Sequence, residues 1–343
     1  MNEYAKNNPL ITVSDVKRRY ENTEIIGVFN PAATNYCGET VLLVRIAERV
    51  KTDGKRAGVP MIINGEYSVR YFDYTDQEYD FSDARVVKGK DRKYLTSMSY
   101  LAVARSKDGE QFTIDYEYGI YPETEYEAYG VEDARICVVE GEYYITYTAV
   151  SDRGICVALA KTQDFKSFEK LGLILTPDNK DVVLFPEKIN GKYYMLHRPS
   201  TSEFGKPEIW IASGSNLSEW GNHSRLIGTE KSGWDSVRIG ACAAPIKTDK
   251  GWLLLYHGAD QTNRYCVGAL LLDLNDPKKV LKRSSKPFLE PINDYEKQGF
   301  FGNVVFPCGC VEKDGKLSIY YGAADDKVCR VDVDIVEILK SLE

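Results

Sequence analysis

Short apolar and aromatic runs recur along the whole chain, and residues such as Gly, Asn, Asp and Lys separate each run from the next. Runs of about four to eight residues that are rich in β-branched and aromatic side chains, bounded by such turn residues, are typical of strands. A helical pattern is convincing only at about residues 336–342, and a short turn is expected near residues 14–19. The pattern therefore predicts an all-β protein with a short C-terminal helix.

The apolar runs form a unit that occurs five times. Each unit has a first strand with a polar residue or proline near its end, a turn containing Gly, an aromatic or aliphatic second strand, and a third strand. The first strands are expected at residues 27–31, 130–133, 183–186, 241–245 and 304–307. Repeats of about 40–50 residues with several strands each indicate a β-propeller. We therefore expect one five-bladed β-propeller spanning residues 1–343, and a pair of β-sandwiches is the alternative.

The first unit is longer than the others. Pro31 and Asp133 lie 102 residues apart, whereas the starting points Asp133, Pro186, Pro245 and Pro307 follow at 53 to 62 residues. The extra length falls at about residues 51–93, in a charged and tyrosine-rich stretch. We expect this insertion to lie near the active-site mouth as a loop or lid.

Composition narrows the class of protein. The 343 residues are 43% hydrophobic and 28% charged, with a net charge of −7, which argues against disorder and against binding to nucleic acid or anionic membranes. No stretch approaches the roughly 20 apolar residues of a membrane helix, and the polar N-terminus does not resemble a signal peptide. The eight scattered cysteines are expected to be reduced, buried thiols. These features predict a cytoplasmic protein.

The most unusual charged pair on a predicted inner strand is Glu132 and Asp133. Strand side chains alternate, so only one of these carboxylates is expected to face a central channel. Arg135 would share a face with Asp133, and a structural ion pair between them is the alternative to a catalytic carboxylate.

Cationic side chains recur at the strand ends of the first four units. Any one of them is most simply a solvated or packing residue, whereas several that converge on one mouth of an acidic protein would form an anion site, such as one for phosphate. These residues are Arg45, Arg153, Lys188, His197, Arg198 and His257.

The order of several motifs resembles glycoside hydrolase family 130 from about residue 8 to residue 330. The branch with the greatest similarity acts on β-1,2-linked mannooligosaccharides, which suggests a β-1,2-mannobiose or β-1,2-oligomannan phosphorylase. The motifs are Asn-Pro-Leu-Ile at residues 8–11, Gly-Val-Phe-Asn at 27–30, Gly-Val-Glu-Asp-Ala-Arg at 130–135, Phe-Pro-Glu-Lys at 185–188, Leu-His-Arg-Pro at 196–199, Tyr-His-Gly-Ala-Asp at 256–260 and Tyr-Gly-Ala-Ala-Asp at 321–325.

The resemblance implies a five-bladed propeller and an inverting phosphorylase that converts β-mannosides and inorganic phosphate reversibly into α-D-mannose 1-phosphate. It makes Asp133 the catalytic acid, although Ala134 stands where many members have proline. It implies phosphate-binding residues at Arg153, Lys188 and His257, with Arg45 and Arg198 as additional members, and sugar-binding residues at Asn30 and Asp325. Family members are often oligomeric, so a homo-oligomer is a further expectation.

A phosphorylase mechanism places requirements on the acid and on the phosphate site. Asp133 has to be protonated to act as an acid, so we expect a raised pKa. A phosphorylase needs a cationic cradle for phosphate in place of a second carboxylate, and the reaction requires no metal or other cofactor.

Two other functions remain open. A β-mannosidase on the same scaffold would need a carboxylate base, for which Glu187 is the candidate, although its neighbour Lys188 argues against it. A non-catalytic carbohydrate-binding propeller would stack sugars on aromatic rings, although the same rings could form the core. Its candidate tryptophans are Trp210, Trp220, Trp234 and Trp252.

Overall fold

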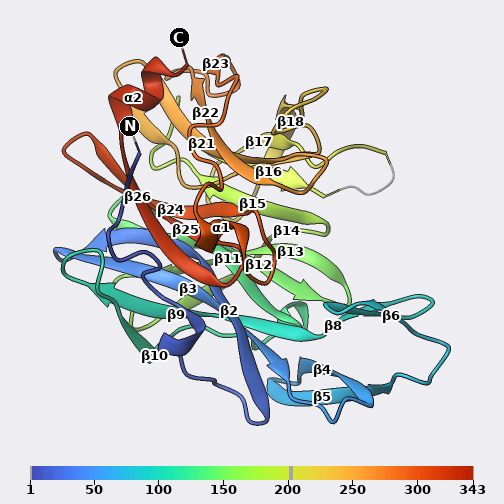
Figure 1. Cartoon of the computed structure of the whole chain (residues 1–343). Coiled ribbons are helices and arrows are strands. Elements are labelled where there is room, and N and C mark those ends of the chain that lie inside the picture. Colours follow the sequence, from blue (N-terminus) through green and yellow to red (C-terminus); the bar gives the residue numbers. More distant parts are fainter. Residues whose placement is uncertain (1, 201–203, 343) are drawn as a thin grey trace.

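The computed structural model describes residues 2–200 and 204–342, and strands dominate it (Figure 1). The described residues contain two short α-helices, α1 (Asp294–Lys297) and α2 (Ile335–Lys340), and 3-10 turns at Val13–Asp15 and Glu125–Glu127. The prediction of an all-β fold with a short C-terminal helix is confirmed. None of the helices in the described part of the chain is long and apolar enough to cross a membrane.

Five antiparallel units follow one another along the chain. The first contains β2 (Thr23–Tyr36), β3 (Glu39–Val50), β9 (Ser97–Ser106) and β10 (Thr113–Ile120), and the second contains β11 (Gly130–Val139), β12 (Glu142–Ser151), β13 (Gly154–Thr162) and β14 (Glu169–Leu175). A parallel bridge between Gly130 and Ser99 joins these two units into one eight-stranded sheet. The third contains β15 (Asn179–Leu184), β16 (Tyr193–Pro199), β17 (Ile209–Gly214) and β18 (Gly221–Ile227).

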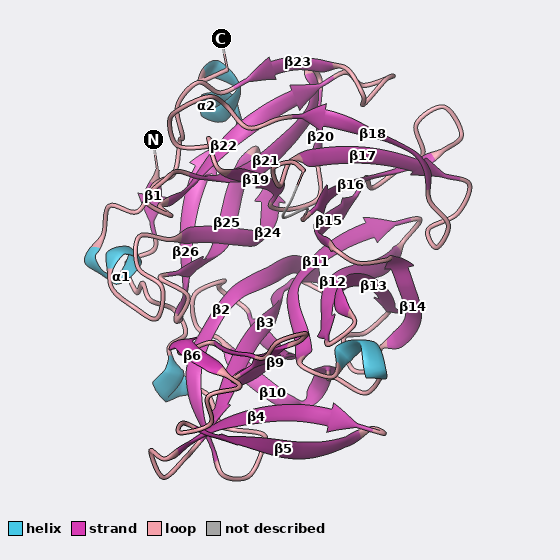
Figure 2. Cartoon of the chain, turned by 90° about the vertical axis from the view of Figure 1, so that its right-hand side faces the viewer, coloured by secondary structure: helices cyan, strands magenta, loops and turns pink. Residues whose placement is uncertain are grey.

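The fourth unit contains β19 (Arg238–Ala241), β20 (Ile246–Thr248), β21 (Gly251–Ala259), β22 (Tyr265–Leu272) and β23 (Val280–Arg283). The fifth contains β24 (Val305–Lys313), β25 (Lys316–Ala323) and β26 (Lys327–Asp334), and β1 (Glu3–Tyr4) pairs with β26 to complete it. Figure 2 shows the units following one another around the molecule in chain order. The N-terminal strand thus joins the last unit of the chain.

The insertion expected at about residues 51–93 contains strands of its own. It consists of the hairpin β4 (Arg56–Ile63) and β5 (Glu66–Asp73), followed by the small sheet β6 (Asp80–Asp83), β7 (Val86–Lys88) and β8 (Lys93–Leu95). Val59, Phe72 and Tyr94 are buried in a separate apolar cluster there. This cluster holds the segment in place, so the insertion is a folded β-structure and not an open loop.

The main apolar clusters pack between neighbouring units, as expected for sheets that bury their faces against each other. Phe185 of the third unit and Trp252 of the fourth meet edge to face, with their ring centroids 5.4 Å apart. Trp252 and Trp234 are buried, and Trp220 packs against the cluster between the second and third units. These three rings belong to the cores, which is the second of the two roles considered for the tryptophans.

The cysteines follow the expectation in most cases. All eight are free, and six are buried in the described structure. Cys37 is exposed and Cys310 is only partly buried, so the prediction of buried thiols is wrong for Cys37.

Candidate active site

Three polar residues occupy equivalent places in the first strands of three units. Asn30 on β2, Asp133 on β11 and Asp181 on β15 have left-handed φ angles of 48°, 48° and 54°. Each lies where the pairing register shifts, between Phe29 and Ala32, Glu132 and Arg135, and Lys180 and Val183, respectively. Such bulges change the direction in which side chains point and are common beside active sites. The repeat therefore re-aims polar side chains in three units, and all three side chains belong to residues that line one cavity.

Asp133 is the centre of a buried polar cluster. Its Oδ1 accepts hydrogen bonds from Nδ2 of Asn30 at 3.0 Å and from Nη1 of Arg45 at 2.9 Å. Nη2 of Arg45 binds Oε1 of Glu132 at 2.8 Å, and Nζ of Lys180 binds Oε2 of Glu132 at 3.2 Å. Both carboxylates thus bind the same guanidinium, but of the two only Asp133 lines the cavity described below, in line with the expectation that one of them would face the centre.

The pKa of Asp133 differs from the sequence-based expectation. Burial acts to raise it, but the charges of Arg45, Arg135 and Lys180 outweigh burial and lower the pKa below its usual value. The nearby carboxyl of Asp325 behaves in the opposite way. Burial raises its pKa to about 7, with Asp133 adding to this rise and Arg45 opposing it. The structure without ligands therefore favours a proton on Asp325 rather than on Asp133.

A cavity of about 330 Å³ opens beside Asp133. Its wall combines acidic, cationic and aromatic side chains from all five units and from the insertion. The lining residues are Asn30, Arg45, Arg85, Asp133, Lys180, Asp181, Arg198, Arg238, Asn263, Tyr265, Phe301, Val304, Phe306 and Asp325. Of the predicted site residues, Asn30, Arg45, Asp133, Arg198 and Asp325 are among them.

Two arginines on this wall have unused donors. The Nε atoms of Arg198 and Arg238 are buried and have no hydrogen-bond partner. A buried donor without a partner is costly, because it has lost water and gained nothing in return. Nη1 of Arg238 binds the hydroxyl of Tyr265 at 3.1 Å. The pair of unpartnered donors is the kind of arrangement that an oxyanion would satisfy.

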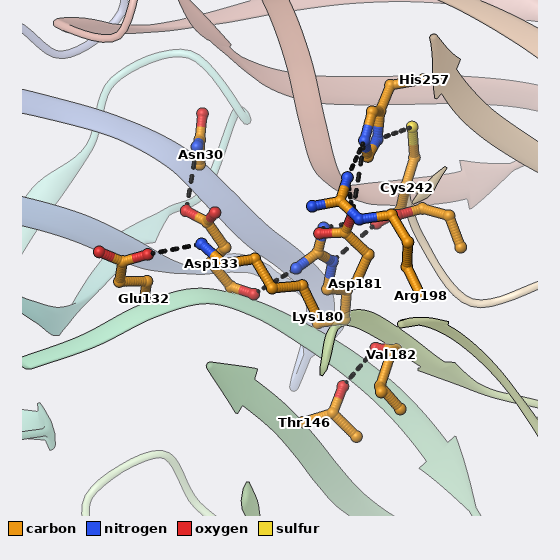
Figure 3. Close-up of polar contacts among 12 residues, drawn as sticks. Asn30, Glu132, Asp133, Thr146, Lys180, Asp181, Val182, Arg198, Cys242 and His257 are labelled. Carbon is orange, nitrogen blue, oxygen red and sulfur yellow. Dashed lines mark hydrogen bonds and ion pairs between the residues drawn. The ribbon is translucent and has the colours of Figure 1, made fainter. Parts of the chain in front are cut away.

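An ion-pair cluster lies beneath Arg198. Asp181 is paired with Nη2 of Arg135 at 2.9 Å through Oδ1 and with Nη1 of Arg198 at 2.6 Å through Oδ2. Figure 3 shows Asn30, Glu132 and Asp133 on one side of the site and Asp181, Arg198 and His257 on the other, with Lys180 reaching toward Glu132. Arg135 also donates to the backbone oxygen of Asp133 at 2.7 Å. Its carboxylate partner is Asp181, so the ion pair considered between Arg135 and Asp133 does not form.

His257 is buried completely and does not line the cavity. Its Nε2 lies 3.3 Å from Nη1 of Arg198 and 3.4 Å from Oδ2 of Asp181. Burial lowers the pKa of His257 to about 3, so the ring is neutral at physiological pH. His257 therefore supports Arg198 from behind and does not reach a ligand in the cavity. His197, likewise buried, contacts Asn179 and His223 instead.

Three further residues considered in the sequence analysis lie outside the cavity. The exposed side chain of Arg153, in the turn after β12, pairs with Glu125, and Lys188, beyond the far end of β15, pairs with Glu140 at 3.2 Å. Glu187, the candidate base of a hydrolase, is exposed and pairs with Lys247 at 2.5 Å. Glu187 and Lys188 follow the end of β15 that is far from its bulge. The turn that carries Arg153 lies at the same end of the sheet as the bulge of β11, but its side chain is exposed and pairs with Glu125 instead of lining the cavity.

The sequence reasoning missed several wall residues, notably Lys180, Asp181 and Arg238. The repeat contained a usable signal for the first two. The sequence alignment of units set Pro186 opposite Asp133, whereas the bulges set Asp181 opposite Asp133. A shift of five residues in that alignment would have revealed Lys180 and Asp181.

Comparison with known proteins supplies independent information. The family model described as beta-1,4-mannooligosaccharide phosphorylase matches residues 81–343. The chain is 47% identical to a beta-1,2-mannobiose phosphorylase of Listeria innocua, in an alignment covering 100% of this chain and 99% of the relative. It is 44% identical to a 1,2-beta-oligomannan phosphorylase of Thermoanaerobacter sp. strain X514, over 69% of this chain and 79% of the relative.

A solved structure gives the same result for the fold. The beta-1,2-mannobiose phosphorylase of Listeria innocua, in complex with beta-1,2-mannobiose, superimposes with a TM-score of 0.96 at 46% identity. The superposition covers 99% of each chain. The similarity thus extends over the whole described molecule.

Proposed function

Because the chain belongs to glycoside hydrolase family 130, we propose that it is a glycoside phosphorylase acting on β-1,2-linked mannobiose or mannooligosaccharides. Inorganic phosphate is the co-substrate, α-D-mannose 1-phosphate is the product, and the reaction is reversible and needs no other cofactor. The observation that carries the proposal is that Arg198 and Arg238, which line the cavity beside Asp133, each have a buried Nε donor without a partner.

In this proposal Asp133 is the catalytic acid. An oxygen of phosphate attacks C1 of the mannosyl group, the bond from C1 to the glycosidic oxygen breaks, and the proton of Asp133 goes to that departing oxygen. The attack inverts the β configuration to α. Asn30 and Asp325 line the same cavity as Asp133 and are assigned to the mannosyl group.

Lys180, Arg198 and Arg238 form the proposed phosphate cradle, and Arg45, which binds Asp133, also lines the cavity. This assignment replaces Arg153, Lys188 and His257, which do not line the cavity. A preorganised cationic wall removes water from phosphate and holds it in line for attack. The cradle is thus the counterpart of the base that a hydrolase would use.

Phosphate also accounts for the proton that Asp133 needs. The cations of the site lower the pKa of Asp133 when the cavity is empty. A bound phosphate dianion brings negative charge next to the same cations and displaces water, and both effects raise the pKa of a neighbouring carboxyl. Binding of phosphate would therefore raise the pKa of Asp133 and favour its protonated form.

The carboxylates of the cavity favour phosphate over water as the nucleophile. Among the described residues that line it, Asp325 lies on the side of Asp133 and Asp181 lies on the opposite side. Burial acts to raise the pKa of Asp181, but Arg198 and Arg135 outweigh it and hold the pKa well below its usual range. So acidic a group is a poor general base for water, which disfavours the β-mannosidase alternative.

We assign the five antiparallel units to the blades of a five-bladed propeller, with β1 closing the last blade. The order of the units around the molecule supports this assignment (Figure 2). The insertion contributes Arg85 to the cavity wall, which supports a place at the active-site mouth. A cytoplasmic location fits a reaction that retains the energy of the glycosidic bond in a sugar phosphate.

Product analysis with and without phosphate tests the proposal. We expect mannose 1-phosphate from β-1,2-mannobiose only when inorganic phosphate is present. The Asp133→Asn variant should lose turnover by several orders of magnitude while still binding the disaccharide, because it removes only the proton donor. Free mannose at equal rates in both mixtures would instead establish a hydrolase, and no binding of mannosides would remove the sugar assignment.

A further inference from the structure

We propose that Asp181 is a positioning residue that fixes the guanidinium of Arg198 so that its Nε edge is presented to phosphate. The inference rests on the proposed function, because it takes phosphate as the ligand of Arg198. It extends that function by assigning a task to a carboxylate which neither touches the sugar nor serves as an acid.

Asp181 is held in one place by its backbone. It has a left-handed φ of 54° at the register shift of β15, and its side chain is 1% exposed. Aspartate adopts this conformation at a cost that the surrounding structure must offset. The bulge turns the carboxylate toward the cations of the wall, as the equivalent bulge does for Asp133.

The two oxygens of Asp181 have different tasks. Oδ1 lies 2.9 Å from Nη2 of Arg135, and Oδ2 lies 2.6 Å from Nη1 of Arg198. Since Arg135 is itself anchored to the backbone oxygen of Asp133, Asp181 connects Arg198 to the strand that carries the proposed acid. The distance between the cradle and the acid is therefore set through one carboxylate.

The ion pair uses one edge of the Arg198 guanidinium and leaves the other available. Nη1 is held by Oδ2 of Asp181 and lies 3.3 Å from Nε2 of His257, whereas Nε has no partner. One carboxylate between two guanidinium groups leaves a net positive charge, so the cluster still attracts an anion. Without Asp181, repulsion between Arg135 and Arg198 would push the free side chain out of position.

Gly240 makes room for this arrangement. A Cβ atom at position 240 would lie 2.2 Å from Oδ2 of Asp181 and 2.6 Å from Cε1 of His257. The φ of Gly240 is not among the positive values, so the backbone conformation does not require glycine here. The close approach of the carboxylate and the imidazole does, and this gives a second way to disturb the same contact without changing a charge.

Steady-state kinetics of Asp181→Asn with both substrates tests the proposal. We expect KM for phosphate to rise about tenfold or more, the scale at which partners that orient a ligand-binding group act, while KM for β-1,2-mannobiose changes less than twofold. Calorimetric titration with inorganic phosphate alone should show the same loss of affinity. A purely structural role would lower the amount of folded protein without separating the two KM values.

Glu127→Gln is the matched control. Glu127 is a buried carboxylate that pairs with Nζ of Lys170 at 2.9 Å, and it does not line the cavity. We expect it to reduce thermal stability and leave KM for phosphate unchanged. Gly240→Ala should raise KM for phosphate as Asp181→Asn does, because the added methyl group displaces the carboxylate.

The outcomes separate this inference from the proposed function. No phosphate-dependent turnover by the unmodified protein would overturn the proposed function itself. Normal turnover with an unchanged phosphate KM in Asp181→Asn or Gly240→Ala would overturn only the positioning role. Failure of both variants to fold would identify Asp181 as a residue required for folding and would also overturn the positioning role.

Discussion

At the scale of single residues, the environment of each charge decides its role. Asp133 and Asp325 line one cavity, yet the pKa of Asp133 is lowered by its cationic neighbours and that of Asp325 is raised to about 7 by burial. Sequence reasoning identified both carboxyls but assigned the raised pKa to Asp133. It could not do better, because the direction of the shift depends on Arg45, Arg135 and Lys180, which the bulges bring together in space.

The free energy of unfolding should depend on pH through the protonation of Asp325. A folded-state pKa near 7 against an ordinary value of 3.8 means that the folded state binds more protons than the unfolded state between about pH 4 and pH 7. The contribution of this group to the free energy of unfolding is therefore present below pH 4 and is lost as the pH rises to 7. Urea denaturation of Asp325→Asn and the unmodified protein measures it.

We expect the unmodified protein to lose more than about 1.4 kcal/mol relative to Asp325→Asn between pH 4 and pH 8, since each pKa unit corresponds to that amount. Other groups titrate in both proteins and cancel in the difference. Parallel curves over this range would show that Asp325 has an ordinary pKa.

Single substitutions also distinguish the two sets of cations. Lys180→Ala and Arg238→Ala should each raise KM for phosphate about tenfold or more, because each removes a cationic donor from the cavity wall. Arg153→Ala and Lys188→Ala remove exposed ion pairs, which contribute little, and should leave this KM within twofold. A larger rise in KM for phosphate in Arg153→Ala and Lys188→Ala than in the other two variants would instead assign Arg153 and Lys188 to the phosphate site.

At the scale of elements, the repeat could be predicted from the sequence, but the bulges could not. The alternation of apolar and turn residues indicated the strands, the five units and the C-terminal helix, because these depend on local sequence. The bulges at Asn30, Asp133 and Asp181 depend on pairing between strands. For this reason Asp133 was found through its motif, whereas Asp181 and Lys180 were missed.

The two ends of one strand explain the error at Lys188. Lys180 lies near the beginning of β15, beside the bulge, and Lys188 lies beyond the end of this strand at Leu184. Both positions are strand ends in the sequence. Only the direction of β15 relative to the cavity determines which of the two lysines reaches the site.

The N-terminal strand should contribute measurably to stability. Glu3 and Tyr4 pair with Asp332 and Val331 of β26, and Tyr4 packs against the core between the fourth and fifth units. Removal of residues 2–6 would break these backbone hydrogen bonds and expose apolar surface. We expect a loss of about 2–4 kcal/mol, from typical values for hydrogen bonds and partial burial of a tyrosine.

Glu3→Ala is the control for this truncation. It removes only the exposed ion pair of Glu3 with Lys316 and should cost no more than about 0.5 kcal/mol. Thermal denaturation of the three proteins compares them. Equal stability of the truncated and unmodified chains would mean that β26 needs no partner at this edge.

At the scale of the whole molecule, the site exists only when all five units are assembled. Asn30 comes from the first unit, Asp133 from the second, Arg198 from the third, Arg238 from the fourth and Asp325 from the fifth. The proposed acid Asp133 and the proposed phosphate ligand Arg198 lie on opposite sides of the site because they belong to different units. This opposition is the geometric basis for a single displacement, in which the nucleophile and the acid act on opposite sides of the sugar.

The anomeric form of the first product tests this claim most directly. We would follow the reaction of β-1,2-mannobiose with inorganic phosphate by NMR and identify the mannose 1-phosphate formed in the earliest spectra. Attack by phosphate from the side opposite Asp133 predicts the α anomer as the initial product. Formation of the β anomer, or of free mannose without phosphate ester, would contradict the account.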